Sequence, residues 1–139
     1  MNTPRGIRNC NPLNIRRTTT HWQGMRQEQT DPQFCQFETM EWGWRAAFRL
    51  LTRTYYTQYH LATIAAIVRK WAPATENNTQ AYIASVARLT GIGPNEPLGS
   101  PAAEPARWMM LAMAMAVHEC GTNTIDALPM LRGWALNQP

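Results

Sequence analysis

The sequence predicts a mainly α fold of the α+β type, in which a helical core follows a small polar lobe of loops and short strands. The chain has 139 residues, which is the usual size of one domain. Hydrophobic residues make up 45% and charged residues 16%, a balance that is typical of folded rather than disordered chains. The hydrophobic pattern becomes helical at Glu41. We therefore expect residues 1–139 to form one domain.

The first 38 residues form the predicted polar lobe. They are rich in Asn, Thr, Gln and Arg and lack helical periodicity. Two short stretches, residues 22–25 and 34–37, have the composition of extended pieces. We expect loops with short strands here.

Two helices are predicted in the next part of the chain. Apolar residues recur at helical spacing over 41–59, while Arg45, Arg49 and Arg53 line another face. Such a row usually faces solvent, and this interpretation is preferred to a polyanion site. Thr63 can cap a helix over 64–71 that ends before Pro73.

Capping residues also delimit the later helices. Asn77 or Asn78 can begin a helix that Gly91 ends, and a loop then runs to about residue 105. The helix over 105–118, which Gly121 ends, is apolar on nearly every face and should be buried at the centre. Its methionines at 109, 110, 113 and 115 are expected as core side chains rather than a binding surface. In the tail we expect at most a short helix near 124–128, interrupted by Pro129.

Charge and composition limit the possible partners. Thirteen basic and nine acidic side chains give a net charge of +4, which suits nucleic acid, anionic lipid or a bacterial wall polymer. The longest apolar run has ten residues, so no transmembrane helix is expected. The three cysteines, Cys10, Cys35 and Cys120, lack zinc-site spacing and are expected as free thiols, with a Cys10–Cys120 bridge as the alternative.

Carboxylates are the candidates for catalysis, because the sequence has no Gly-rich phosphate loop, HExxH motif or Gly-x-Ser-x-Gly motif. No metal and no cofactor are therefore expected. Glu119 follows ten apolar residues at the predicted end of a buried helix, where burial and the helix dipole should raise its pKa. A raised pKa suits a proton donor to a glycosidic oxygen. The alternative is that Glu119 pairs with an arginine or with His118.

Three other carboxylates are weaker candidates. Glu76 lies just before a predicted helix N-terminus, where the dipole favours the ionised form, so it suits a general base. Asp31 and Glu38 in the polar lobe are candidates for a second carboxylate. Helix capping and turn formation are the structural alternatives for these residues.

The amide-rich segment 5–16 is either a hydrogen-bonded structural knot or a surface that recognises a polar ligand such as a sugar. Asn9 and Asn14 are its candidate binding residues. Trp22 and Trp42 can stack on sugar rings or pack in the core. Tyr82 and Trp71 are expected in the helical core, beside the loop that carries Glu76, and Tyr82 is also a candidate for substrate binding.

The sequence contains RGIRNCNPLNIRR, followed by WQG, TDPQF, GWRA and WAPATENNTQAY. These motifs resemble small phage virion and prophage proteins that open with RGIRNNNPGNIR and carry a lysozyme-like peptidoglycan-degrading module. The resemblance covers most of the chain, from Arg5 to about Gly121. It includes the family's His-Glu-x-Gly helix end, matched by residues 118–121, which also looks like the helix end that bears the catalytic glutamate of lysozyme-type folds.

Two positions depart from the family pattern. Cys10 stands where the family usually has Asn, and Leu13 stands where it usually has Gly. If that Gly needs a positive φ, Leu13 should strain or reshape the loop.

The resemblance implies a lysozyme-like domain that cleaves the glycan strand of peptidoglycan as a muramidase or a lytic transglycosylase, with Glu119 as the general acid. The alternatives are a non-catalytic virion or wall-binding module and a basic nucleic-acid-binding protein; nucleic acid is the less expected partner. Besides peptidoglycan, an immunity or virion protein is a candidate partner. The start of the chain lacks the pattern of a secretory signal, so we expect synthesis in the cytoplasm and delivery to the wall by phage lysis, a virion or a secretion system.

Overall fold

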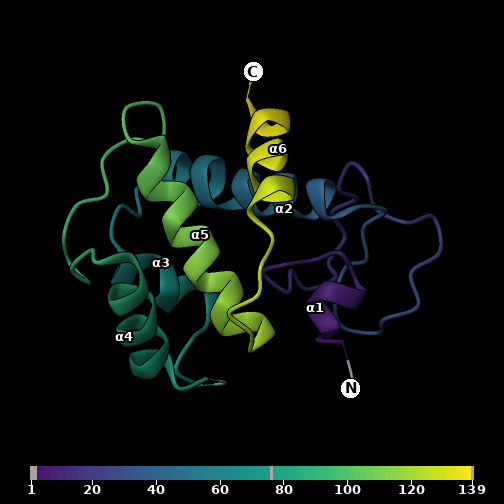
Figure 1. The fold of residues 1–139 in the computed structure, drawn as a ribbon, viewed down its shortest axis with the longest axis horizontal. Helices are drawn as coiled ribbons and strands as arrows, with labels where there is room; N and C mark the ends of the chain where they lie inside the picture. The colour runs from purple at the N-terminus through teal and green to yellow at the C-terminus, as the bar shows by residue number, and fades with distance from the viewer. Residues whose placement is uncertain (1–2, 76, 139) are drawn as a thin grey trace.

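The protein is mainly helical, as the sequence predicts (Figure 1). The computed structural model describes residues 3–75 and 77–138. In these residues the β structure is limited to two isolated antiparallel bridges, Arg16–Phe34 and Met25–Phe37, where short strands are expected. The helices are α1 (Arg5–Arg8), α2 (Met40–Phe48), the π-helix η1 (Arg49–Gln58), α3 (Ile64–Trp71), α4 (Thr79–Thr90), α5 (Pro105–Cys120) and α6 (Ala127–Asn137).

The helix predicted over 41–59 is formed by α2 and η1 without a break. Thr39 caps it by accepting a hydrogen bond from the backbone N–H of Trp42. From Arg49 onward the helix is wider, and Thr57 donates its hydroxyl to the carbonyl of Thr52, five residues earlier. Leu51 and Tyr55 lie on the buried side of this π-helix.

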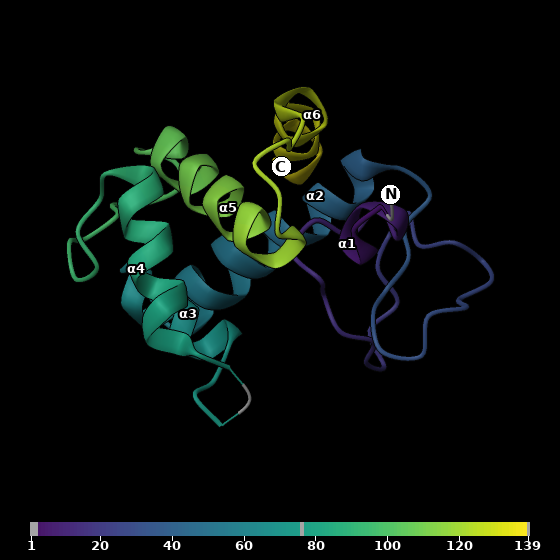
Figure 2. The ribbon, with the colours of Figure 1, turned by 60° about the horizontal axis from the view of Figure 1, so that its bottom comes forward.

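The predicted caps of α3 and α4 are confirmed. Thr63 accepts a hydrogen bond from the N–H of Ala66, and Asn78 rather than Asn77 accepts one from the N–H of Ala81. Gly91 ends α4 in the left-handed conformation at φ 72°, which costs glycine little because it has no Cβ. Together α3 and α4 lie on the side of the molecule opposite α1 (Figure 2).

The buried character of α5 is confirmed only for part of its surface. Trp108, Leu111 and Met115 have no exposed surface. The expectation for the methionines is wrong for Met110, which is 42% exposed, while Met109 and Met113 are half-buried and pack against the core cluster. All three line an apolar groove of about 360 Å³ that Leu89, Ala127 and Met130 border, so this face of α5 is open between α4 and α6 in the described part of the chain.

The tail differs most from its prediction. It forms the eleven-residue helix α6, and Pro129 is the third residue of that helix. A proline is tolerated there because the N–H groups of a first turn have no partner within the helix. Asp126 caps the helix through the N–H of Leu128. Gly133 lets α6 cross α2 closely, since a Cβ at this position would overlap Trp44.

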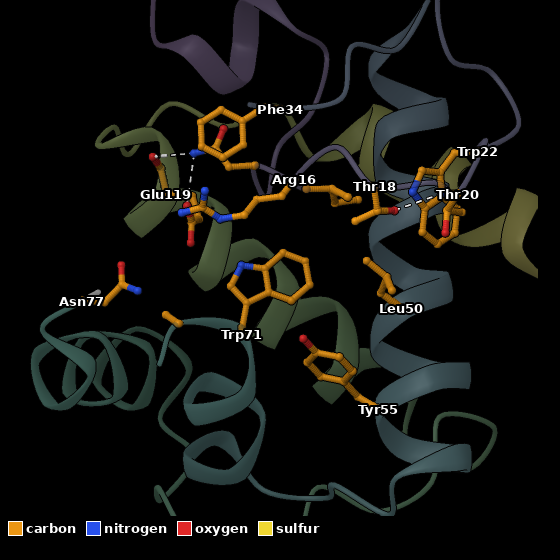
Figure 3. Close-up of a pocket in the computed structure, with 13 residues that line it drawn as sticks. Arg16, Thr18, Thr20, Trp22, Phe34, Leu50, Tyr55, Trp71, Asn77 and Glu119 are labelled. Atoms are coloured by element: carbon orange, nitrogen blue, oxygen red, sulfur yellow. Dashed lines mark hydrogen bonds between the residues drawn. The ribbon is translucent and has the colours of Figure 1, made fainter. Parts of the chain in front are cut away.

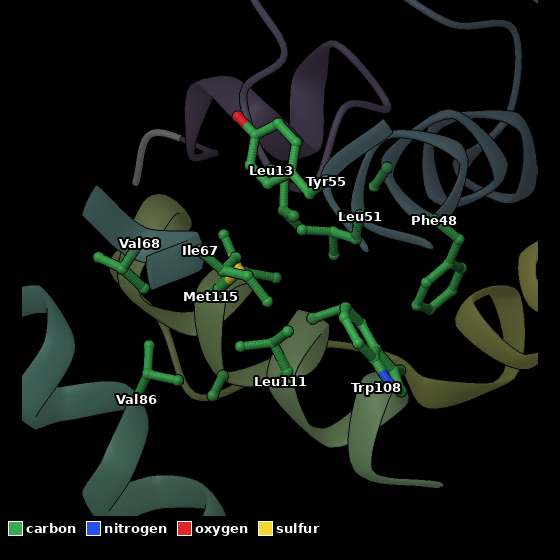
Figure 4. Close-up of a cluster of buried hydrophobic side chains, with 14 of the residues drawn as sticks. Leu13, Phe48, Leu51, Tyr55, Ile67, Val68, Val86, Trp108, Leu111 and Met115 are labelled. Carbon is green, nitrogen blue, oxygen red and sulfur yellow. The ribbon is translucent and has the colours of Figure 1, made fainter. Parts of the chain in front are cut away.

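One cluster of buried side chains joins the polar lobe to the helices (Figure 4). Leu13 belongs to it and has no exposed surface. The expected strain at Leu13 is wrong, because the positive φ angles of this loop belong to Cys10 (51°) and Asn14 (53°). Leu13 therefore anchors the lobe in the core.

The arginine row of α2 and η1 is partly engaged with the protein. Arg45 lies 6.0 Å from the ring centroid of Trp42, and Arg53 donates to the carbonyl of Asn137 at 3.1 Å. Burial and the charges of Arg49 and Arg53 lower the pKa of Arg45.

Among the described residues, no helix has both the length and the apolar character needed to cross a bilayer.

Candidate functional site

A cavity of about 470 Å³ lies between the polar lobe and the helices (Figure 3). The lobe supplies one wall, and the sides of η1 and the end of α3 supply another. Glu119, near the end of α5, stands at one end of the cavity, and Leu50 and Tyr55 stand at the other (Figure 3). The lining residues are Asn14, Ile15, Arg16, Thr18, Thr20, Trp22, Phe34, Leu50, Tyr55, Trp71, Ala72, Asn77 and Glu119.

The carboxylate of Glu119 is held from two sides by neutral donors. Asn14 donates its amide N–H to Oε1 at 3.1 Å, and Tyr82 donates its hydroxyl to Oε2 at 3.0 Å. His118 is not a partner of this carboxylate; its ring stacks on Tyr82 with centroids 3.8 Å apart. Glu119 is thus fixed between the polar lobe and α4.

The two hydrogen bonds of Glu119 differ in what they permit. The amide nitrogen of Asn14 can only donate, so Oε1 stays an acceptor. A hydroxyl can donate or accept, so Oε2 can carry a proton and keep its bond to Tyr82. Burial, and then the charge of Glu119, raises the pKa of Tyr82 well above its usual value, which keeps the phenol protonated. The arrangement therefore tolerates both states of the Glu119 carboxyl group.

Close packing positions Asn14 against the end of α5. Asn14 has a φ of 53°, a left-handed conformation that Asn adopts more readily than most residues. Gly6 of α1 packs beside it: a Cβ at Gly6 would lie 3.0 Å from both Asn14 Oδ1 and Cys120 Sγ. A Cβ would also lie 2.9 Å from the backbone oxygen of Asn11, so a larger side chain at Gly6 requires these neighbours to shift.

Asn9 and Asp31 lie outside the cavity wall and form a separate cluster. Arg5 donates to both oxygens of Asp31, at 2.6 and 2.7 Å, and the amide of Asn9 donates at 2.9 Å. The backbone N–H groups of Gln33 and Phe34 also donate to this carboxylate. The bonds from Arg5, above all, lower the pKa of Asp31.

This cluster corrects two expectations. Asn9 is only 4% exposed, and its side-chain oxygen Oδ1 accepts a hydrogen bond from the side-chain amide of Gln36. The Asn9 side chain is therefore structural and not available to a sugar. Asp31 is 8% exposed and is part of the same network, so it is not a second carboxylate of the cavity. The hydrogen-bonded knot is thus the correct interpretation for this part of the segment, while Asn14 reaches the cavity.

Of the remaining candidate site residues, some line the cavity and others do not. Glu38 is exposed and does not line the cavity, and Glu76 lies outside the described residues. Trp22 does line the cavity and is half-buried, whereas Trp42 does not. Tyr82 is buried as expected, at 2% exposure, and contacts Glu119 from behind the wall.

Trp71 confirms its expectation in part. Its side chain is half-buried and packs against the core cluster, but it also lines the cavity, and its indole meets the ring of Tyr55 edge-on at 5.9 Å (Figure 3). The helical spacing that predicts an inward position is correct, but the space that Trp71 faces is the cavity.

Several lining residues were not found from the sequence. Phe34 carries the guanidinium groups of Arg5 and Arg16 over its ring, at 4.6 and 5.5 Å from the centroid. Leu50 and Tyr55 lie on a helix whose apolar spacing indicates only core positions. For the described residues that line the cavity, Glu119 is the one carboxylate.

The cysteines are not linked to one another. Cys10, Cys35 and Cys120 are free, as predicted. Burial raises the pKa of Cys120 to about 11. In the described part of the chain, no group of three or more His, Cys, Asp or Glu side chains lies close enough to hold a metal ion.

Comparison with known proteins shows a similarity to a phage protein. No family model matches the chain. The chain is similar to Protein P5 of Pseudoalteromonas phage PM2, with 44% identity over 97 residues. The match covers 68% of this chain and 60% of that protein, so the chain spans less than two thirds of its relative's length. A phage protein is therefore among the relatives of this chain.

Proposed function

We propose that the protein cleaves the glycan strand of peptidoglycan between N-acetylmuramic acid and N-acetylglucosamine, with Glu119 as the general acid. The observation that carries the proposal is the position of Glu119: a cavity-lining carboxylate near the end of a helix, facing a polar lobe and bonded to two neutral donors. The resemblance to lysozyme-like proteins implies a catalytic glutamate at such a helix end.

The cavity suits a sugar chain in size and chemistry. Its wall combines aromatic side chains, Trp22, Phe34 and Trp71, with hydroxyl and amide groups of Thr18, Thr20 and Asn77. Aromatic faces stack on the apolar faces of sugar rings, and the polar groups can bond to ring hydroxyls. The net charge of +4 favours an anionic polymer such as the bacterial wall.

In the proposed reaction, Glu119 passes its proton to the glycosidic oxygen as the bond to the anomeric carbon breaks. Attack by water then gives hydrolysis, and attack by the muramyl 6-hydroxyl gives a 1,6-anhydro product. Inversion by water requires a second carboxylate at about 6.5 to 9.5 Å. Glu76 is the remaining candidate for that role, because its neighbour Asn77 lines the cavity. The transglycosylase route needs Glu119 alone.

The similarity to a phage protein is in keeping with a phage origin, and delivery to the wall by a virion, a phage lysis system or a secretion system is part of the proposal. A non-catalytic wall-binding module would use the same cavity and the same charge. In that case the protein would sediment with purified peptidoglycan and release no soluble fragments.

Digestion of purified peptidoglycan, followed by mass spectrometry of the soluble fragments, tests the proposal. Reducing ends would establish a muramidase, and 1,6-anhydro ends would establish a lytic transglycosylase. The Glu119→Gln variant is the blank, because the amide is nearly isosteric and cannot donate the proton. Wall binding without fragments from the wild-type protein would refute the enzymatic function.

A further inference from the structure

The cavity has two chemically different ends, and the proposed acid catalysis by Glu119 accounts for only one of them. Glu119 and Asn14 lie at the polar end, while Leu50, Tyr55 and Trp71 gather at the other end (Figure 3). Nothing in the proton transfer from Glu119 requires this second end.

Tyr55 is the unusual group of the second end. It is 9% exposed, and its hydroxyl points toward the cavity rather than into the core (Figures 3 and 4). The hydroxyl has no hydrogen-bond partner in the described part of the chain. Because this hydroxyl opens onto the cavity, it can donate a hydrogen bond to a ligand bound there.

The surroundings of this hydroxyl define the ligand. Leu50 and the edge-on indole of Trp71 provide apolar surface next to one hydroxyl. Burial raises the pKa of Tyr55 to about 12, so the phenol is a donor at any physiological pH. A matching group has a small apolar part beside a hydrogen-bond acceptor.

We propose that Tyr55, Leu50 and Trp71 form a subsite for the acetamido group of an N-acetylated sugar, with the phenol of Tyr55 donating to the acetyl carbonyl. The methyl group would lie against Leu50 and the indole. This inference rests on the proposed function, since it assigns a substituent of the same substrate. It makes the second end the part of the cavity that distinguishes N-acetylated glycans from plain glucans.

Binding of two neutral tetrasaccharides tests the subsite. Chitotetraose carries acetamido groups, and cellotetraose carries hydroxyls at the same carbons. Titration of the Glu119→Gln protein, followed by tryptophan fluorescence or calorimetry, measures both affinities without turnover. We expect chitotetraose to bind more tightly. Tyr55→Phe in the same background should weaken chitotetraose binding by about 5- to 10-fold and leave cellotetraose unchanged, as the loss of one neutral hydrogen bond predicts.

A matched control is the neighbouring Tyr59→Phe. Tyr59 lies next to Tyr55, with centroids 6.4 Å apart, but is 45% exposed and does not line the cavity. It should change neither affinity. The subsite is refuted if Tyr55→Phe leaves the difference between the two sugars intact, weakens both equally, or if chitotetraose does not bind to the folded Glu119→Gln protein.

The failure of this inference and the failure of the proposed function can be told apart. Release of fragments from peptidoglycan by the wild-type protein, with an unchanged sugar preference in Tyr55→Phe, would remove the subsite and keep the enzyme. Selective chitotetraose binding without any fragment release would keep the subsite and remove the enzyme.

Discussion

Two carboxylates, Asp31 in the polar lobe and Glu119 at the end of α5, meet opposite kinds of partner. Asp31 is held by the permanent charge of Arg5, by the Asn9 amide and by backbone N–H groups. Glu119 is held by the uncharged Asn14 and Tyr82. A charged partner fixes a carboxylate in its ionised form, whereas neutral partners let it exchange a proton. The first arrangement builds the lobe, and the second is available for chemistry.

The largest effect is expected from Glu119→Gln. It should reduce the release of muropeptides by at least about 100-fold, because general acid catalysis contributes that much or more. The free energy of unfolding should change by less than about 1 kcal/mol, because no charged partner is lost. Fragment release and urea denaturation measure the two effects.

Glu96→Gln is the matched control for this prediction, since Glu96 is an exposed carboxylate bonded to Arg107 outside the cavity. It should keep full activity. Near-normal activity of Glu119→Gln, together with a folded but inactive Glu76→Gln, would instead make Glu76 the proton donor.

Asp31→Asn should have the reverse effect. It exchanges a buried, ionised acceptor for a neutral amide and leaves Arg5 without its partner. We expect the free energy of unfolding to fall by about 2 kcal/mol, the size of a hydrogen bond to a charged group, while the folded fraction keeps its activity. Glu38→Gln, an exposed carboxylate of the same lobe, should change stability by less than about 0.5 kcal/mol. Equal midpoints for Asp31→Asn and the wild type in urea would contradict the structural role.

Tyr82→Phe should produce a smaller effect, because it removes one of the two donors to Glu119 and keeps the ring stacked on His118. We expect kcat to fall by about 10-fold, equivalent to about 1.4 kcal/mol, with little change in KM. Tyr56→Phe is the control, since Tyr56 packs edge-on against Trp108 and does not line the cavity. A change confined to KM would make Tyr82 a binding residue instead.

The smallest expected effect is a pH dependence of the stability difference between the wild-type protein and Asp31→Asn. Its pKa is lowered in the folded protein, so its contribution to stability is complete above the unfolded-state pKa of about 3.9. That contribution is lost as the pH falls toward the lower folded-state pKa. The difference in stability between wild type and Asp31→Asn should therefore be constant from pH 7 to 5 and narrow by about 1 kcal/mol at pH 3. Urea midpoints at these three pH values measure it, and a constant difference would refute the ionised pair.

Much of the helical part could be predicted from the sequence, because caps and periodicity are local. Thr63, Asn78, Gly91 and Gly121 act where the sequence places them. The prediction of a short, interrupted helix in the tail failed for a local reason as well. Pro129 falls in the first turn of α6, where the loss of a backbone N–H costs no hydrogen bond within the helix. The prediction that every methionine of α5 is a core side chain failed because hydrophobicity does not reveal which neighbour covers a face of a helix.

The site was less predictable, since its partners come from distant parts of the chain. Glu119 could be singled out by its place at the end of an apolar helix, yet its partners Asn14 and Tyr82 lie 105 and 37 residues away. Asn9 and Asn14 look alike in the sequence, but one is buried against Asp31 and the other reaches the cavity. Periodicity likewise placed Tyr55 and Trp71 on inward faces without showing that a cavity lies there.

The sequence by itself determined the helices before the tail, the polar lobe and the identity of the candidate acid, because these depend on caps, spacing and composition within a few residues. Only the tertiary structure decided which carboxylate is bonded to the neutral donors Asn14 and Tyr82 and which is neutralised by Arg5. It also decided that the phenol of Tyr55 borders the cavity. The physical reason is that hydrogen-bond partners and burial depend on which distant segments pack together, and Gly6 and Leu13 set that packing where the lobe meets the helices.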